Sequence, residues 1–183
     1  MPIMSLQTGS ELARTSRAII NPRKLSIVAY ELEGRLLNFD PALLRVEDIR
    51  EIGPMGMIID SSDELVSPDD IIKLKEVYHL GFEMDGLKVV DDRKKTVGRV
   101  IGYTLETGGF IIQQLKVKRP LVQSFGDTEL LIHRSQIVKL TNDRVIVKSP
   151  KIRHKEPVVE PTLQNFENPF RKAPQSQPES IDA

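Results

Sequence analysis

The chain has no cysteine and no tryptophan, and aromatic residues make up only 5% of its 183 residues. Without cysteine there are no disulfides, thiolate nucleophiles or cysteine-ligated zinc or iron–sulfur sites. The core must therefore consist mainly of isoleucine, valine and leucine. Apolar runs extend over a few residues only, far short of the roughly 20 that span a bilayer. The first residues do not resemble a signal peptide, and we expect a cytoplasmic protein without membrane insertion.

The net charge of zero hides a separation of charge along the chain. Residues 1–85 carry 9 basic and 15 acidic side chains, whereas residues 86–150 carry 12 basic and 6 acidic ones. In one interpretation the two blocks attract one another, within the molecule or in a homodimer. In the other, the basic block binds an acidic partner such as RNA.

Two stretches of the chain have the same apolar pattern. They read "EDIREIGPMGMIID" at Glu47–Asp60 and "SQIVKLTNDRVIVK" at Ser135–Lys148. The aligned pairs, 88 residues apart, are Ile49 and Ile137, Ile52 and Leu140, Ile58 and Ile146, and Ile59 and Val147. Earlier in the chain, Arg14 aligns with Arg99 at a spacing of 85. This pattern predicts a duplicated unit, with a longer loop in the second copy near "KRPLVQSFGD".

Short aliphatic segments separated by turn residues predict strands in both units. In the second unit, "ETGG" predicts a hairpin turn in which Gly108 and Gly109 take positive φ. Between the units, "SPDDIIKLKEVYHLG" predicts a helix over Ser67–Gly81, with Ser67 as N-cap and Gly81 as C-terminal cap. Its apolar face comprises Ile71, Leu74, Val77 and Tyr78.

The residues from position 150 onward contain six of the twelve prolines, with glutamine, serine and glutamate between them. This composition predicts a disordered tail. Within it, "TLQNFENPFRK" places Leu163, Phe166 and Phe170 at helix-like spacing. The segment is either a linker or a short motif that orders on a partner.

Both units resemble the PRC-barrel family. The second reads "GLKVVDDRKKTVGRVIGYTLETGGFIIQQLKV", in which a polar turn, "GRV" at Gly98–Val100, a hairpin and an aliphatic strand follow one another. The first has the same order but "ART" at Ala13–Thr15 in place of "GRV". The resemblance covers about residues 4–150. It implies small β-barrels that act as docking platforms and share no catalytic residues.

We therefore predict an all-β protein of two small PRC-type β-barrels joined by a helix, with a disordered Pro-rich C-terminal tail. The predicted divisions are 1–66 for the first unit, 67–85 for the linking helix, 86–149 for the second unit and 150–183 for the tail.

The sequence offers little support for catalysis. The three histidines, His79, His133 and His154, are far apart, and no pair has the spacing of a helical zinc site. Dinucleotide, P-loop and hydrolase motifs are absent. We expect neither a cofactor nor a metal, and we expect that the protein is not an enzyme.

The sequence thus predicts a non-catalytic adaptor that docks a protein partner, with the tail as a second contact. The candidate partner-binding residues are Arg93, Lys94 and Lys95 in one turn, and Phe166 and Phe170 in the tail. The alternative is an RNA- or ribosome-associated assembly factor that uses the basic second unit.

Overall fold

The computed structural model describes residues 1–120 and 128–149. They belong to the first of two compact units of the chain, Met1–Pro150; the second, Lys151–Ala183, lies outside the described residues. The predicted disordered tail, with Phe166 and Phe170, therefore lies outside them too.

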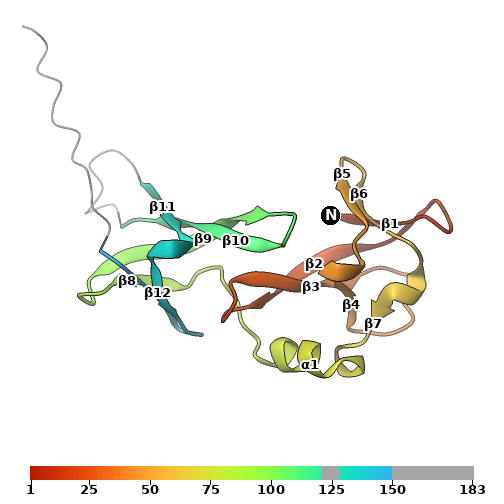
Figure 1. Cartoon of the computed structure of the whole chain (residues 1–183), viewed down its shortest axis with the longest axis horizontal. Coiled ribbons are helices and arrows are strands. Elements are labelled where there is room, and N and C mark those ends of the chain that lie inside the picture. Colours follow the sequence, from red (N-terminus) through yellow and green to blue (C-terminus); the bar gives the residue numbers. More distant parts are fainter. Residues whose placement is uncertain (121–127, 150–183) are drawn as a thin grey trace, which may run out of the picture. The chain divides into compact units, whose positions relative to one another are not determined.

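The described residues form mainly strands (Figure 1). The first repeat contains β1 (Pro2–Ser5), β2 (Glu11–Asn21), β3 (Ser26–Glu33), β4 (Ala42–Arg45), the 3₁₀ helix η1 (Val46–Asp48), β5 (Glu51–Gly53) and β6 (Gly56–Ile59). The linking segment contains η2 (Ser62–Glu64), β7 (Leu65–Val66), η3 (Pro68–Asp70) and α1 (Ile72–His79). The second repeat contains β8 (Lys88–Asp91), β9 (Thr96–Glu106), β10 (Ile111–Lys118), β11 (Glu129–His133), η5 (Arg134–Gln136), β12 (Ile137–Leu140) and β13 (Arg144–Val147).

The strands pair in the same order in both repeats. In the first, β1 pairs antiparallel with β2 and parallel with β6, and the pairs β2–β3, β3–β4 and β5–β6 are antiparallel. In the second, β8 to β13 repeat this arrangement. The registers also correspond, because Ile3 faces Met57 and Val89 faces Val145. The predicted duplication is present, and the spacing changes from 85 to 88 between β10 and β11, where the longer loop was expected.

The two closed barrels predicted from the sequence are not formed. The described strands make one open sheet in the order β12-β13-β8-β9-β10-β3-β2-β1-β6-β5, to which β4, β7 and β11 are added. The consecutive strands β4 and β5, which η1 separates, do not pair, and neither do β11 and β12, which η5 separates.

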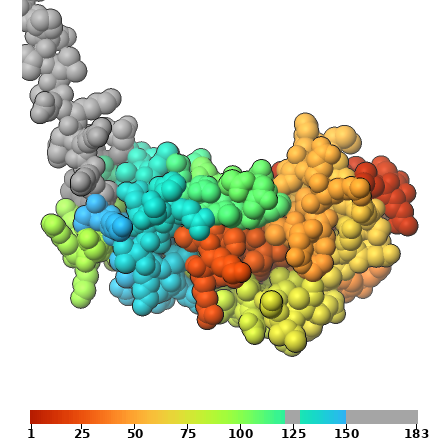
Figure 2. All heavy atoms as spheres, viewed as in Figure 1, coloured from red at the N-terminus to blue at the C-terminus, as the bar shows by residue number. Residues whose placement is uncertain are grey.

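The hairpins β2–β3 and β9–β10 join the two repeats, and Figure 2 shows their red-orange and green atoms packed against each other. The backbone N–H of Ile27 donates to the carbonyl of Phe110 at 2.9 Å, and the N–H of Ile112 donates to the carbonyl of Leu25 at 2.8 Å. Leu25 and Phe110 are equivalent residues 85 positions apart, so the two hydrogen bonds are reciprocal.

Positive φ in these hairpins is found at Leu25 and Phe110, both at 52°, and not at Gly108 or Gly109 as the sequence predicted. Positive φ is unfavourable for side chains of this size. The pairing between the hairpins holds both residues in this conformation, and a local turn pattern does not encode that pairing.

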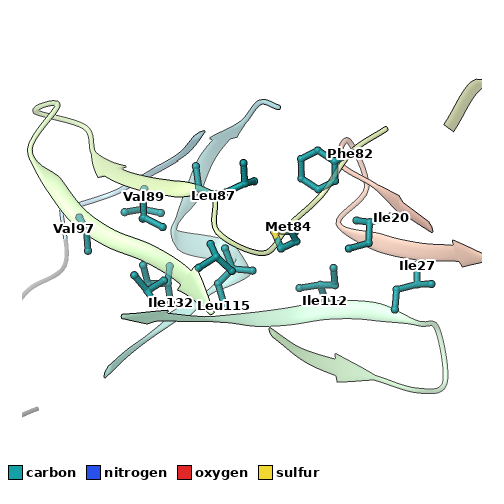
Figure 3. Packing of buried hydrophobic residues seen from close by; sticks show 14 of the residues in the cluster. Ile20, Ile27, Phe82, Met84, Leu87, Val89, Val97, Ile112, Leu115 and Ile132 are labelled. Atoms are coloured by element: carbon teal, nitrogen blue, oxygen red, sulfur yellow. The ribbon is translucent and has the colours of Figure 1, made fainter. Parts of the chain in front are cut away.

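One hydrophobic cluster contains residues of both repeats. Figure 3 shows Ile20 and Ile27 of the first repeat near Ile112 of the second, with Phe82 and Met84 of the linking segment beside them. Phe82 and Met84 are almost fully buried. Two other clusters belong to the first repeat and its linking segment, one of them beneath α1.

The predicted helix is shorter than expected. Ser67 caps η3 and not α1: it forms a capping box with Asp70, and Ile71 is then extended, with φ −131° and ψ 114°. The predicted apolar face is confirmed, since Leu74 and its apolar neighbours pack on the first repeat. Gly81 follows the helix with φ +55°, as a C-terminal cap requires.

Candidate polyanion-binding face

Four basic residues lie directly opposite one another on neighbouring strands of the second repeat. Across the sheet, Arg144 on β13 faces Lys88 on β8, Lys88 faces Arg99 on β9, and Arg99 faces Lys118 on β10. Residues directly opposite on paired strands share one face of the sheet. All four side chains are exposed, and together they form what we call the basic row.

Ion pairs with other described residues do not neutralise the basic row. Between described residues, all ion pairs within 4.0 Å involve residues 11–75, and none includes a member of the row. Like charges directly opposite on paired strands destabilise a sheet. An anion bound along the row would offset the repulsion between these like charges.

The first repeat has no such row. The positions equivalent to Arg144, Lys88, Arg99 and Lys118 are Gly56, Pro2, Arg14 and Glu33. The one basic residue among them, Arg14, pairs with Glu11 at 2.7 Å. The row is therefore a property of this unit and not of the shared fold.

The charge around the row is uneven. Glu83, Asp85 and Asp143 line a shallow hollow together with Lys88 and Arg99. At the other end, Lys118 faces Glu129 on β11, and the exposed Lys116 lies two residues before it on β10. Carboxylates therefore lie near both ends of the row, and Lys116 adds a further positive charge beside Lys118.

Gly98 allows Arg99 and Lys118 to lie side by side. A Cβ atom at Gly98 would lie 2.2 Å from the carbonyl oxygen of Lys118 and 2.8 Å from a methyl group of Val117. Only glycine permits so close an approach of β9 and β10. The glycine of the "GRV" sequence is therefore required by the close packing of β9 against β10. The equivalent residue of the first repeat is Ala13.

The predicted binding residues Arg93, Lys94 and Lys95 form the turn between β8 and β9, and all three are exposed. Asp91, only 8% exposed, holds this turn. Its Oδ1 accepts hydrogen bonds from the backbone N–H groups of Arg93 at 2.9 Å and Lys95 at 2.7 Å. The turn projects from the end of β8 opposite to Lys88, so it does not join the basic row.

Lys94 has a positive φ at a position where the equivalent turn of the first repeat has a glycine. In the first repeat, Gly9 donates to the carbonyl of Ser5 and has a φ of +65°. In the second, Lys94 donates to the carbonyl of Asp91 and also has a φ of 65°. A lysine therefore occupies a left-handed position that a glycine fills without strain.

The basic turn is adjacent to a carboxylate that stays charged. The Ser149 hydroxyl donates to Asp92 Oδ1 at 2.5 Å. This hydrogen bond lowers the pKa of Asp92 below its usual value, and the positive charge of Arg93 acts in the same direction. The exposed anion limits the net positive charge of the turn, as the carboxylates of Glu83, Asp85, Asp143 and Glu129 limit that of the basic row.

Sequence reasoning identified the basic turn but missed Lys88, Arg99 and Arg144. These residues are 11 or more positions apart, and only strand register brings them together. Because buried valines alternate with Lys88 and Arg99, the sequence pattern could have placed both basic residues on the outer faces of their strands. It could not have shown that they lie in one row.

The histidines with described structure have structural roles. His133 Nδ1 lies 3.2 Å from the Ser135 N–H, which donates to it at the start of η5. His79 ends α1. Within residues 1–120 and 128–149, no three acidic or histidine side chains come together as metal ligands would. In the same part of the chain no helix is long and apolar enough to cross a membrane.

No protein-family model matches the chain, and no curated protein matches its sequence. Among solved structures, it is similar to a 16S ribosomal RNA processing protein, RimM, from Pseudomonas aeruginosa. The sequences are 15% identical over 81% of this chain and 76% of that one, and the TM-score is 0.29. A TM-score of 0.29 does not establish a shared overall arrangement, and membership of the PRC-barrel family stays a prediction.

Proposed function

We propose that this protein is a non-catalytic, RNA-associated assembly factor whose basic row contacts the phosphate backbone of RNA. The observation that carries the proposal is the row itself: Arg144, Lys88, Arg99 and Lys118 lie in register on four neighbouring strands without an ion pair among the described residues.

The geometry of the row suits a linear polyanion. Neighbouring strands lie about 4.8 Å apart, so four side chains in register span roughly 14 Å. A nucleic-acid strand offers evenly repeated negative charges over such a distance, and neutralising them releases counterions.

The row favours contacts with phosphates over contacts with bases. Base recognition in single strands relies on exposed aromatic rings, and Tyr103, the aromatic residue on β9, packs against the hydrophobic core. We therefore expect binding with little dependence on sequence, as phosphate contacts give.

The dependence of RNA affinity on salt tests the proposal. With a labelled RNA hairpin, the logarithm of the binding constant should fall against the logarithm of salt concentration with a slope of roughly −3 for four phosphate contacts. Arg99→Gln should weaken binding and make the slope shallower by about 1. Fluorescence anisotropy of the labelled RNA gives both values.

The matched control is Arg14→Gln, which removes the same charge at the equivalent exposed position of the first repeat. It should leave the affinity and the slope unchanged. Equal effects of the two substitutions, or RNA binding without salt dependence, would show that the basic row is not the site.

Docking of a protein partner through Arg93–Lys95, Phe166 and Phe170 stays a prediction. The same holds for a homodimer formed by the acidic and basic units. Mutating the three basic residues of the turn together should weaken RNA binding if the turn assists the row.

A further inference from the structure

The two repeats differ at the outer edge of one strand. In the first repeat, β7 covers the edge of β4: Leu43 faces Val66 and Leu44 faces Leu65 in antiparallel register. Leu43 is fully buried, in a cluster with Leu74 of α1 against which Val66 of β7 packs. The linking segment thus supplies a short strand that completes the sheet of the first repeat.

The equivalent strand of the second repeat is β11, which pairs with β10 as β4 pairs with β3. Leu131 and Ile132 correspond to Leu43 and Leu44. No described strand pairs with the outer edge of β11. Leu131 is 56% exposed, whereas Leu43 is not exposed at all.

The edge of β11 has few features that prevent strand addition. Exposed edges are usually protected by proline, by lysine or by an irregular backbone. The strand reads "ELLIH", from Glu129 to His133. It contains no proline or lysine, and its pairing with β10 is regular over five consecutive residues.

The surface beside this edge suits a strand better than a helix. Beneath α1, the outer face of the first repeat is apolar, with Ile19, Ala29 and Leu43. The equivalent residues of the second repeat are Thr104, Gln114 and Leu131. A helix does not pack on a mainly polar face. A partner would therefore contact the backbone edge of β11 and the Leu131 side chain.

We infer that β11 is a docking edge that accepts an extended segment of a protein partner, in which aliphatic residues are flanked by carboxylates. The segment adds to β11 as β7 adds to β4, with an aliphatic side chain against Leu131. Lys116, directly opposite Leu131, and Lys118 attract the carboxylates. Lys118 belongs to both this site and the basic row, whereas Leu131 and Lys116 are not among the proposed RNA contacts.

The chain itself contains a suitable probe. Residues Ser61–Asp70, "SSDELVSPDD", include β7 and carry four carboxylates and no basic residue. The experiment titrates this synthetic peptide into the isotope-labelled full chain and follows backbone amide shifts. We expect the largest shifts at residues 129–133.

Two substitutions test the role of Leu131. Leu131→Ser should weaken peptide binding about tenfold, since a leucine contact of this size contributes roughly 1.4 kcal/mol. The matched control is Ile101→Ser, which removes a side chain that is 45% exposed on β9, a strand paired on both sides. It should leave the affinity unchanged.

Three results would overturn the proposal. The first is a negative result in either binding test: no change in the amide shifts of residues 129–133, or an equal loss of peptide affinity with Leu131→Ser and Ile101→Ser. The second is equal binding of a peptide in which both Leu65 and Val66 are replaced by serine, which would show that charge alone attracts it. The third is protection from hydrogen exchange, in the free protein, of the β11 amides that point away from β10, which would mean that the chain itself or a second copy occupies the edge.

Discussion

Lys94 adds a positive charge to the surface of its turn but has an unfavourable backbone conformation. It has a φ of 65° in a turn where the first repeat has Gly9 at the same angle. Non-glycine residues in the left-handed region cost about 1 kcal/mol or more. A cation retained at such a position fits a role in attracting an anion, as the sequence predicted for the Arg93–Lys95 turn.

Lys94→Gly should therefore stabilise the protein by about 1 kcal/mol, because the left-handed strain is removed. Urea unfolding followed by circular dichroism measures this change. The control is Lys95→Gly, which removes the same charge where φ is not positive and should destabilise by roughly 0.5–1 kcal/mol. A loss of stability with Lys94→Gly would show that its φ carries no strain in solution.

At the scale of elements, α1 is held by its packing and by a contact at its last turn. It is a helix of eight residues, too short to be stable by itself. Leu74 is 5% exposed, within the cluster formed with Ile19, Ala29 and Leu43. The Arg17 guanidinium also lies 5.6 Å from the centre of the Tyr78 ring.

Leu74→Ala should lower the free energy of unfolding by roughly 2–5 kcal/mol, because it leaves a cavity beneath the helix. Ile72→Ala on the opposite, exposed side should change it by less than about 0.5 kcal/mol; Ile72 is 78% exposed. Thermal unfolding of both variants checks this. Similar losses from both would mean that α1 packs through a different face.

At the scale of the whole described region, one hydrophobic cluster contains residues of both repeats. Ile20 and Ile27 of the first repeat belong to the same cluster as Val89, Leu115 and Val145 of the second. A shared core couples the stability of the elements that form it. The repeats should therefore unfold together, although each has its own complete set of strand pairs.

Ile27→Ala should destabilise both repeats equally, by roughly 2–5 kcal/mol. Hydrogen exchange measured at increasing denaturant would report on β1 and β6 in the first repeat and on β8 and β13 in the second. We expect one common transition, shifted by the same amount in all four strands. Separate transitions, with only the first repeat affected, would indicate independent domains.

Much of the fold could be predicted because its signals are local. The aliphatic pattern at spacings of 85 and 88 identified the duplication, and the apolar residues Leu74 and Val77 identified the buried face of the linking helix. Gly81 was correctly assigned to the helix end, since glycine adopts positive φ more readily than any other residue. The helix face and the helix end depend on neighbours within a few positions of the chain, and the duplication on comparing two such local patterns.

Tertiary structure alone decided the features on which the proposed functions depend. Lys88, Arg99, Lys118 and Arg144 form a row because strand register places distant residues opposite one another. The reciprocal hydrogen bonds of Leu25 and Phe110 keep the sheet continuous, where the sequence predicted two barrels. Leu43 and Leu131 are equivalent leucines in the sequence, yet one is buried and the other exposed. The physical reason is the same in each case: pairing and burial depend on which segments meet in space, and a one-dimensional pattern does not contain that information.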